Sequence, residues 1–460
     1  MKKLNNFLDN KCRQNGSILG LSIRCSISGK IMYDHFATTR LQPASNLKIV
    51  TAVAALSKLG PDYTFQTAVY MDGEMVRGGY QGNIYLVGKG DPTLQLKDYM
   101  RFVTSLKEKG IRRISGDFIL DDSWYDDIRW SQDLIWKDQQ YAYGSEVSAL
   151  SLAPDTDYDT NSIKFIVKPE QIGASPTVEI IPHAEGITIT NKAITTAEAD
   201  EEELIIHRHH DKNQFIISGK IGIKEGKQEV YMAIKDIEIY IAKTVKRMLE
   251  KVGIVLKGKI KRGKTPVDAE CIYQQASPPL SKIVVPFMKQ SNNGIGEMLT
   301  KELGRITFGD GTWEAGIAAL KEALVPYCIR LDTLQLRDGS GISAANFIPA
   351  EELTRLLFEI QKEKWFPDFL NSLPKAGEED RMVGGTLRHR MKGLDVRAKT
   401  GTIEGVSTLS GYLTNLNGNQ LIFSILFNHL LDEDKGKDLE DELIALLAEI
   451  TNWSTDGSSS

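Results

Sequence analysis

Residues 43–61 read PASNLKIVTAVAALSKLGP, and this stretch decides the fold that the sequence predicts. Its apolar residues recur at helical spacing, at Leu47, Val50, Ala54, Leu56 and Leu59. Ser45 stands where a helix N-cap is expected, and Gly60-Pro61 ends the pattern. Because residues three apart share one face of a helix, we expect Ser45 and Lys48 to lie side by side.

This Ser-x-x-Lys spacing is also a chemical pattern. A serine hydroxyl is a weak nucleophile until a neighbouring base takes its proton, and Lys48 is placed to do so. Lysine acts as a base only when neutral, and burial beside a second cation such as Lys399 would lower its pKa toward the working range. The alternative for Ser45 is a plain helix cap, which is common at helix starts.

A second motif, Ser291-Asn292-Asn293, precedes a helical pattern that runs through Met298, Leu299 and Leu303. The Ser291 hydroxyl can relay a proton, and the Asn293 amide can hold a substrate carbonyl. Taken alone, the motif also fits an ordinary helix cap.

A third motif, Lys399-Thr400-Gly401-Thr402, leads into residues 406–413, and both segments are typical of paired strands. One ammonium and two hydroxyls suit a substrate carboxylate, and Gly401 would let a substrate backbone lie close alongside. The alternative is an exposed strand and turn. Each motif is weak alone, but all three in this order, on these kinds of element, favour a catalytic site.

Other patterns in the chain are interpreted as accidental. Ser372 and Lys375 repeat the first spacing, but Pro374 interrupts the helix that would stack them. Gly88-Lys89-Gly90 lacks the third glycine of a dinucleotide fingerprint and is interpreted as a turn. The residues 207–210, His-Arg-His-His, fall in a strand pattern that splits them between two faces, so we expect a solvated strand. We therefore predict neither a metal site nor a cofactor.

Composition bounds the function only loosely. The 460 residues carry a formal charge of −5, which argues against a nucleic-acid partner bound by a broad basic face. No stretch approaches the roughly 18 apolar residues of a membrane helix, so we expect no transmembrane segment. Four scattered cysteines favour buried free thiols, although a bridge between Cys12 and Cys25 stays open.

The pattern changes along the chain. Residues 18–34 predict a hairpin around Ser28-Gly29-Lys30, and short β segments dominate from about residue 64 to residue 264. Within that stretch, residues 161–219 are nearly all alternating strands. Asp236 then begins an amphipathic helical pattern that ends at Gly253.

At this point the residues resemble a family, the low-molecular-mass class C penicillin-binding proteins, which are D-alanyl-D-alanine carboxypeptidase/endopeptidases. Beyond the three motifs, the likeness includes residues 88–94, 141–143, 148–150, 338–343 and 384–388. It implies an α+β fold: a β-lactamase-like transpeptidase domain, an antiparallel sheet with helices, carrying inserted β-rich domains. We predict the catalytic domain at 1–65 plus 266–460, a second domain at 66–160 plus 220–265, and a nested third at 161–219.

The resemblance also implies a mechanism. Ser45 would attack the carbonyl between the last two D-alanines of a peptidoglycan stem peptide, and Lys48 would take its proton. Ser291 would relay a proton to the leaving D-alanine. Asn293 would hold the peptide amide, whereas Lys399, Thr400 and Thr402 would bind the terminal carboxylate. The N–H groups of Ser45 and Thr402 would form the oxyanion hole, and β-lactams would acylate the same serine.

Three further residues are assigned to substrate binding by the same resemblance. Asp138 stands where some members bind the free amino end of a diaminopimelate side chain, and a carboxylate suits a cation. Trp136 would line that subsite together with Tyr143. For Asp138 and Trp136, plain surface packing is the alternative.

Rival functions and the location follow from the same features. A β-lactamase or esterase on this scaffold is one alternative, but we find no convincing extra glutamate base. A peptidoglycan-binding module without turnover is another, and the intact Lys48 argues against it. The substrate implies a periplasmic or cell-envelope location. Residues 4–11 lack the apolar core of a secretory signal, so we expect a leader on the natural precursor.

Overall fold

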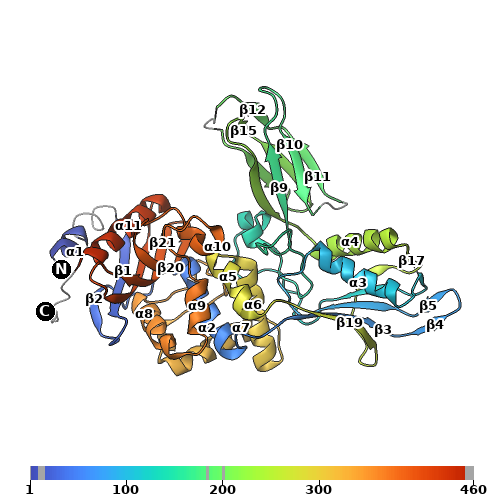
Figure 1. Ribbon diagram of the computed structural model, residues 1–460, viewed down its shortest axis with the longest axis horizontal. Coiled ribbons are helices and arrows are strands. Elements are labelled where there is room, and N and C mark those ends of the chain that lie inside the picture. Colours follow the sequence, from blue (N-terminus) through green and yellow to red (C-terminus); the bar gives the residue numbers. More distant parts are fainter. Residues whose placement is uncertain (1, 9–15, 183–185, 199–201, 451–460) are drawn as a thin grey trace. The chain divides into compact units, whose positions relative to one another are not determined.

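The computed structural model describes residues 2–8, 16–182, 186–198 and 202–450 (Figure 1). The chain forms two compact units. Unit 1 contains Met1–Tyr63, Ser131–Asp133 and Pro279–Ser460, and unit 2 contains Thr64–Trp130 and Leu134–Pro278. The further division into a nested third domain stays a prediction. None of the helices in the described ranges is long and apolar enough to cross a membrane.

Unit 1 is built on one five-stranded antiparallel sheet, in the order β2-β1-β22-β21-β20. The strands are β1 (Ile18–Cys25), β2 (Ile31–His35), β20 (Asp395–Ile403), β21 (Val406–Thr414) and β22 (Gln420–Asn428). The predicted hairpin is β1 and β2. Pairing of β1 with β22 joins the two ends of the chain, so the blue β1 lies among red and orange strands in Figure 1. The strand that carries Lys399 to Thr402, β20, is at the edge of the sheet.

Helices cover both faces of this sheet and form a separate group beside it. The α-helices of unit 1 are α1 (Lys2–Phe7), α2 (Leu47–Lys58), α5 (Leu280–Lys289), α6 (Asn293–Phe308), α7 (Trp313–Leu324), α8 (Ala350–Glu359), α9 (Phe366–Ser372), α10 (Arg381–Gly384) and α11 (Glu433–Glu449). Helix α11 packs on β21 through Leu443 and Leu447, whereas α8 packs on β1 and β22. Helices α2, α6 and α7 pack together, which places the starts of α2 and α6 near each other.

Short 3-10 turns complete unit 1. They are η3 (Ala44–Asn46), η6 (Val325–Tyr327), η7 (Leu331–Thr333), η8 (Ile360–Lys362) and η9 (Gly385–Leu387). One of them corrects a prediction. Ser45 is not the N-cap of the helix that follows it, because it lies inside η3 and α2 begins two residues later. The N-cap position belongs to Asn46.

In the residues that the structure describes, unit 2 consists of several small sheets and two α-helices. A five-stranded sheet has the order β18-β8-β6-β3-β19 and a four-stranded sheet the order β17-β7-β5-β4. The other sheets are β10-β9-β16, β11-β14-β13 and β12-β15. The strands in the described part of unit 2 are β3 (Gln66–Met71), β4 (Glu74–Val76), β5 (Gly79–Gln81), β6 (Ile84–Gly88), β7 (Arg113–Ile114), β8 (Phe118–Asp121), β9 (Ser162–Lys168), β10 (Thr177–Ile181), β11 (Thr188–Asn191), β12 (Ile194–Thr196), β13 (Ile205–Arg208), β14 (Gln214–Ser218), β15 (Lys220–Gly222), β16 (Gln228–Ala233), β17 (Val255–Leu256), β18 (Ile260–Arg262) and β19 (Glu270–Ala276).

The helical elements of unit 2 are α3 (Leu96–Glu108), α4 (Ile237–Val252), η4 (Trp136–Gln140) and η5 (Ala142–Gly144). Helix α4 has the predicted limits, from Asp236 to Gly253. Asp236 itself makes no side-chain cap bond; the Glu146 carboxylate accepts from the N–H groups of Asp236 (2.9 Å) and Ile237 (3.0 Å) instead. A distant residue thus supplies the cap that the local sequence does not.

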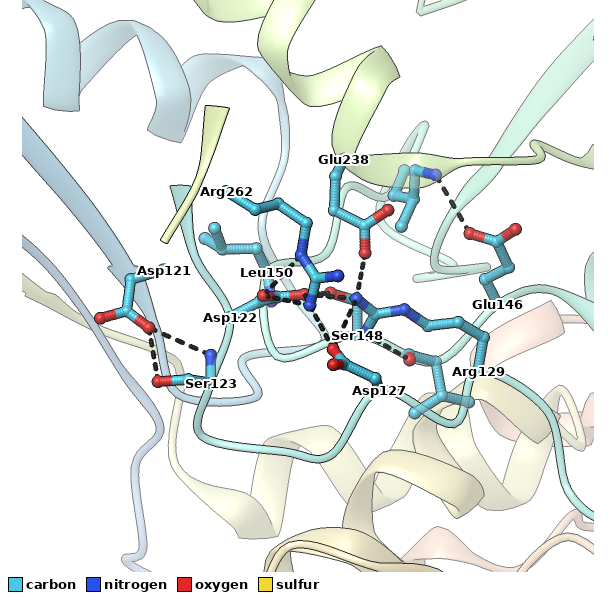
Figure 2. A network of polar contacts seen from close by, with 12 residues as sticks. Asp121, Asp122, Ser123, Asp127, Arg129, Glu146, Ser148, Leu150, Glu238 and Arg262 are labelled. Atoms are coloured by element: carbon cyan, nitrogen blue, oxygen red, sulfur yellow. Dashed lines mark hydrogen bonds and ion pairs between the residues drawn. The ribbon is translucent and has the colours of Figure 1, made fainter. Parts of the chain in front are cut away.

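A network of charged side chains holds the same region together (Figure 2). The Asp122 carboxylate accepts from Arg262 Nη2 at 2.9 Å and from Arg129 Nη2 at 2.5 Å. Arg129 also pairs with Glu238, on the first turn of α4. Asp122, Arg129 and Glu238 are largely buried. Loss of any one of them would therefore leave a buried charge without its partner. The network therefore joins β18, α4 and the segment after β8.

Several smaller predictions are settled here. Cys25, Cys271 and Cys328 are free, but Cys271 and Cys328 are exposed, so the prediction of buried thiols is wrong for them. Cys12 lies outside the described residues.

The 207–210 segment departs from its prediction at one residue. Arg208 is buried and donates to the Gln139 carbonyl oxygen at 2.7 Å, so this strand is not solvated throughout. Within the described ranges, no group of three or more His, Cys, Asp or Glu residues could hold a metal ion.

Candidate active site

The site begins where η3 leads into α2. The turn presents the Ser45 hydroxyl, and the first turn of α2 brings Lys48 beneath it, with 2.8 Å between Lys48 Nζ and Ser45 Oγ. Lys48 is fully buried, whereas Ser45 keeps partial exposure. A neutral amine at this distance can take the hydroxyl proton.

Close packing of three chain segments fixes the serine. A Cβ on Gly401 would lie 2.8 Å from the backbone nitrogen of Ser45, and it would also meet Thr408 Oγ1. The Thr408 hydroxyl donates to the Pro43 carbonyl at 2.8 Å. Strands β20 and β21 therefore lie directly against the turn that holds Ser45, and any larger residue at 401 would push them apart.

The Lys48 side chain uses all three of its hydrogen-bond positions. Besides Ser45 Oγ, its Nζ contacts Asn293 Oδ1 at 2.7 Å and the Ser340 carbonyl at 2.8 Å. Burial lowers the pKa of Lys48 to about 7, against the opposing pull of the Glu297 and Asp338 carboxylates, which raise it. A substantial fraction of Lys48 is therefore neutral near pH 7.

A second serine and lysine face each other across the site. Lys399 Nζ contacts Ser291 Oγ at 2.8 Å and the Thr400 carbonyl at 2.8 Å. Ser291 has a φ of 57°, a left-handed conformation that is rare for a residue with a side chain. Burial first, and the neighbouring Lys48 second, lower the pKa of Lys399 well below its ordinary value.

The three motifs thus meet in one place. Helix α2 carries Lys48, the start of α6 carries Asn293, and β20 carries Lys399 to Thr402. Thr400 is half-buried and Thr402 is exposed at the end of the edge strand. The helix-cap alternative for the second motif applies to Asn292, whose side chain accepts from the Ile295 N–H at 2.9 Å, and not to Ser291.

Sequence reasoning missed Glu297, and it gave residues 338–343 only as part of the family likeness, without their role in supporting Lys48. The Glu297 carboxylate accepts from the N–H groups of Gly339 (3.2 Å) and Ser340 (2.9 Å), and it shapes the loop whose carbonyl holds Lys48. Asp338 is buried in the same loop and accepts from the N–H of Gly341 at 2.8 Å. Glu297 lies one turn after Asn293 on α6, so a helical projection could have found it.

Asn46 was missed for a different reason. Its buried side chain lies between β20 and β21, within 3.1 Å of Ser410 Oγ. With the amide oxygen and nitrogen exchanged, it also reaches the Lys399 carbonyl at 2.5 Å and the Leu409 N–H at 3.2 Å. Asn46 therefore ties the start of α2 to the strand that carries Lys399, a contact that no local pattern indicates.

The three remaining predicted residues belong to unit 2. Tyr143 donates to Asp138 Oδ1 at 3.0 Å, and this carboxylate, with burial as the larger cause, raises the pKa of the phenol. Trp136 is 62% exposed and its ring stacks on His210, with 4.1 Å between the ring centroids. Turns η4 and η5 bring Asp138, Tyr143 and Trp136 to one region of unit 2.

Comparison with known proteins agrees with this geometry. A family model, described as the D-Ala-D-Ala carboxypeptidase 3 (S13) family, matches residues 1–450. A D-alanyl-D-alanine carboxypeptidase of Actinomadura sp. (strain R39) is 36% identical over 421 residues, which cover 90% of this chain and 78% of the relative. The D-alanyl-D-alanine carboxypeptidase DacB of Haemophilus influenzae is 25% identical over 418 residues, 90% of this chain and 86% of that protein.

The fold is shared with a solved structure. Penicillin-binding protein 4 (dacB) of Haemophilus influenzae superposes with a TM-score of 0.82 and 24% identity, covering 98% of this chain and all of the other. This likeness confirms the predicted α+β, penicillin-binding fold. Fold and site together define a serine-type peptidase. The chain belongs to the D-Ala-D-Ala carboxypeptidase 3 (S13) family, and it is a serine-type D-Ala-D-Ala carboxypeptidase, as the resemblance predicted.

Proposed function

We propose that Ser45 is the nucleophile and Lys48 the general base of this carboxypeptidase. The contact of 2.8 Å between Lys48 Nζ and Ser45 Oγ is the observation that carries this proposal. The pKa of Lys48, about 7, lets the free amine take the Ser45 proton as the oxygen attacks the carbonyl between two D-alanines. The tetrahedral intermediate then collapses to an acyl-enzyme on Ser45.

The leaving D-alanine needs a proton on its nitrogen. Ser291 donates its hydroxyl proton to that nitrogen and recovers one from Lys399, 2.8 Å away. The left-handed backbone of Ser291 turns its hydroxyl toward Lys399, which supports this role. Before deacylation, Lys48 gives up to solvent the proton that it took from Ser45, and Lys399 regains a proton from solvent. A water then attacks the ester, Lys48 takes one proton of that water, and it passes this proton to the departing Ser45 oxygen.

The substrate lies along the edge strand β20. The Ala398 N–H donates outward from the sheet, to the Pro374 carbonyl at 3.0 Å. Because outward-facing groups recur every second residue in a strand, the N–H of Thr402 points to the same edge. It forms the oxyanion hole with the Ser45 N–H, and Gly401 keeps the two close by leaving no side chain between them.

The terminal carboxylate binds at Lys399, Thr400 and Thr402. An arriving carboxylate favours the charged form of Lys399, whose pKa burial otherwise lowers. The Asn293 amide, already in contact with Lys48 at 2.7 Å, holds the peptide group on the acyl side of the scissile bond. β-Lactams imitate the D-Ala-D-Ala amide and acylate Ser45 by the same route.

Unit 2 contributes a site for a cationic side chain. Asp138 is partly exposed, is oriented by Tyr143 and has Trp136 nearby, an arrangement suited to an ammonium group. We assign it the free amino end of a diaminopimelate residue. Peptidoglycan stem peptides and their D-Ala-diaminopimelate cross-links are accordingly the substrates, and the enzyme works in the periplasm or cell envelope.

Labelling with fluorescent penicillin tests the nucleophile. The native protein labels and S45A does not, whereas S45A keeps its folded melting profile. Equal labelling of both proteins would overturn the assignment of Ser45. Incubation of the native protein with a pentapeptide ending in D-Ala-D-Ala releases D-alanine, and labelling without release would contradict the carboxypeptidase reaction. Isolated cross-linked muropeptides test the endopeptidase reaction in the same assay.

A further inference from the structure

Residues 235–264 of unit 2 hold a concentration of positive charge that the whole chain does not have. The segment contains ten lysines and arginines against three aspartates and glutamates, a formal charge of +7, whereas the chain as a whole carries −5. Part of this charge is paired, as Lys261 contacts Asp117 and Arg262 contacts Asp122. A local excess of this size attracts an anionic partner.

A cavity of about 690 Å³ opens within this segment, where α4 packs against β17 and β18. Each of these two strands is the outermost strand of its sheet, and Figure 1 shows α4 beside β17. The apolar residues that line the cavity are Ala242, Leu249, Ile254, Val255, Leu256 and Ile260. Both the volume and the mostly apolar lining are typical of a ligand-binding cavity.

Three lysines line the same cavity. Lys243 and Lys246 come from α4, and Lys259 directly precedes β18. Residues three apart share one face of a helix, so Lys243 and Lys246 lie on the same side of α4. All three side chains are exposed, and among the described residues none of their ammonium groups is in an ion pair. The carboxylate of Glu250 also lines the cavity, which leaves its lining with a net charge of +2.

The ammonium groups and the apolar lining together select a class of ligand. A lysine keeps its ammonium in water while its stem lies along apolar surface, so an anionic group binds at the rim and an apolar group binds below it. A nucleic acid or polyphosphate would satisfy the lysines but would leave the apolar lining in water. Val255, at 51% exposed, adds an apolar side chain that a lipid bilayer would cover. The ligand that satisfies both parts is an anionic amphiphile.

We propose that this cavity binds an anionic phospholipid at a membrane surface. The phosphodiester of the lipid lies among the ammonium groups of Lys243, Lys246 and Lys259, and the first part of one acyl chain lies in the apolar cavity beside Val255. Charge attraction and a small apolar contact together give reversible binding that salt weakens. This inference goes beyond the carboxypeptidase reaction and does not rest on the roles proposed for the catalytic residues.

Sedimentation with vesicles tests the proposal on the full chain. Vesicles of equal parts phosphatidylglycerol and phosphatidylcholine are compared with vesicles of phosphatidylcholine alone, at about 0.1 M salt. We expect the protein to bind the anionic vesicles only, and to be released when the salt rises to about 1 M. Failure to bind the anionic vesicles, or equal binding to both kinds, would overturn the proposal.

Removal of the three lysine charges should weaken this binding strongly. One lysine near an anionic membrane surface changes the affinity about fivefold, so K243Q/K246Q/K259Q should bind about 100-fold more weakly than the native protein. The measured quantity is the lipid concentration at which half of the protein sediments. Native affinity in this variant would overturn the assignment of the lysines.

A second triple variant controls for net charge. K364Q/K392Q/K435Q removes three exposed lysines of unit 1 and changes the formal charge of the chain equally. It should bind the anionic vesicles as the native protein does. An equal loss in both triple variants would show attraction by overall charge and would overturn the cavity as the site.

Val255 tests the apolar part of the site. V255S replaces an exposed apolar side chain with a polar one and leaves the charge unchanged. Loss of about two buried methyl groups should weaken vesicle binding about tenfold. V325S is the matched control, since Val325 is 60% exposed in unit 1, and it should bind as the native protein does. Native affinity in V255S would mean that the site takes a polyanion rather than a lipid, and it would overturn the proposal.

Activity without vesicles separates this inference from the proposed function. The melting temperature verifies that each variant is folded, and release of D-alanine from the pentapeptide should be native in all of them. Loss of both vesicle binding and D-alanine release in K243Q/K246Q/K259Q would show a general structural effect and would overturn the lipid site. If even the native protein releases no D-alanine while the vesicle results hold, the proposed reaction fails and the lipid site stands.

Discussion

Two segments of unit 1 carry the same Ser-x-x-Lys spacing, but the serine and lysine side chains are in contact in only one of them. At Ser45 and Lys48 the two side chains meet at 2.8 Å inside the protein. At Ser372 and Lys375 they part: the Ser372 hydroxyl donates to the Phe369 carbonyl of its own helix, and Lys375 pairs with Glu378 near the surface. Spacing alone therefore does not make a nucleophile and a base.

The difference lies in what the backbone does after the serine. Beyond Ser45, η3 continues directly into α2, so the chain coils through the lysine and stacks it under the hydroxyl. Ser372 is instead the last residue of α9, and Leu373 is already extended before Pro374. The interruption by proline was expected from the sequence. The two lysines also differ in burial: Lys48 is fully buried, whereas Lys375 is partly exposed.

The largest expected effect comes from removing each lysine in turn. K48M should slow acylation by penicillin by roughly 10²–10⁴-fold, because the Ser45 proton loses its acceptor. K375M is the matched control and should acylate at the native rate, since the Lys375 ammonium pairs with Glu378 and not with Ser45. Stopped-flow acylation kinetics measure both. A native rate in K48M, or a comparable loss in K375M, would remove the distinction between the two segments.

A smaller change in the acylation rate is expected when the pH is varied. Since burial lowers the pKa of Lys48 to about 7, its neutral form increases as pH rises through that value. The acylation rate should therefore climb about tenfold per unit between pH 5 and 6 and level off above about pH 8. K375M should show the same dependence of the acylation rate on pH, and K48M should lose the rise between pH 5 and pH 8. A native rate that falls over this range would require a different base.

The smallest effect is expected from the carboxylate near Lys48. Glu297 raises the pKa of that amine, so E297Q should move the midpoint of the pH profile to lower pH, by less than about one unit. Exposed Glu322, which pairs with Lys58, supplies the control E322Q, for which no shift is expected. An upward shift in E297Q would mean that Glu297 acts on Lys48 by other means than its charge.

Much of the local structure was predictable because it depends on local periodicity. The helix after Ser45, the paired strands around Lys399 and the limits of α4 all follow from apolar spacing and turn residues. The order of the three motifs then indicated one shared site.

The support of the site was not predictable, since it depends on contacts between distant residues. The Ser340 carbonyl that holds Lys48 lies 292 positions along the chain, and no periodicity announces such a contact. The contact of Asn46 with Ser410 likewise has no local pattern that predicts it. Ser45 was misplaced as a cap for a related reason: a serine before a helical pattern fits both an N-cap and a 3-10 turn.

Mapping the penicillin adduct tests the central claim most directly. The native protein is treated with penicillin G, digested and analysed by tandem mass spectrometry, which locates the penicilloyl group on one residue. We predict a single adduct on Ser45 and an unmodified peptide around Ser372. An adduct on Ser372 or Ser291, with Ser45 unmodified, would contradict the claim that the buried Lys48 makes Ser45 the nucleophile.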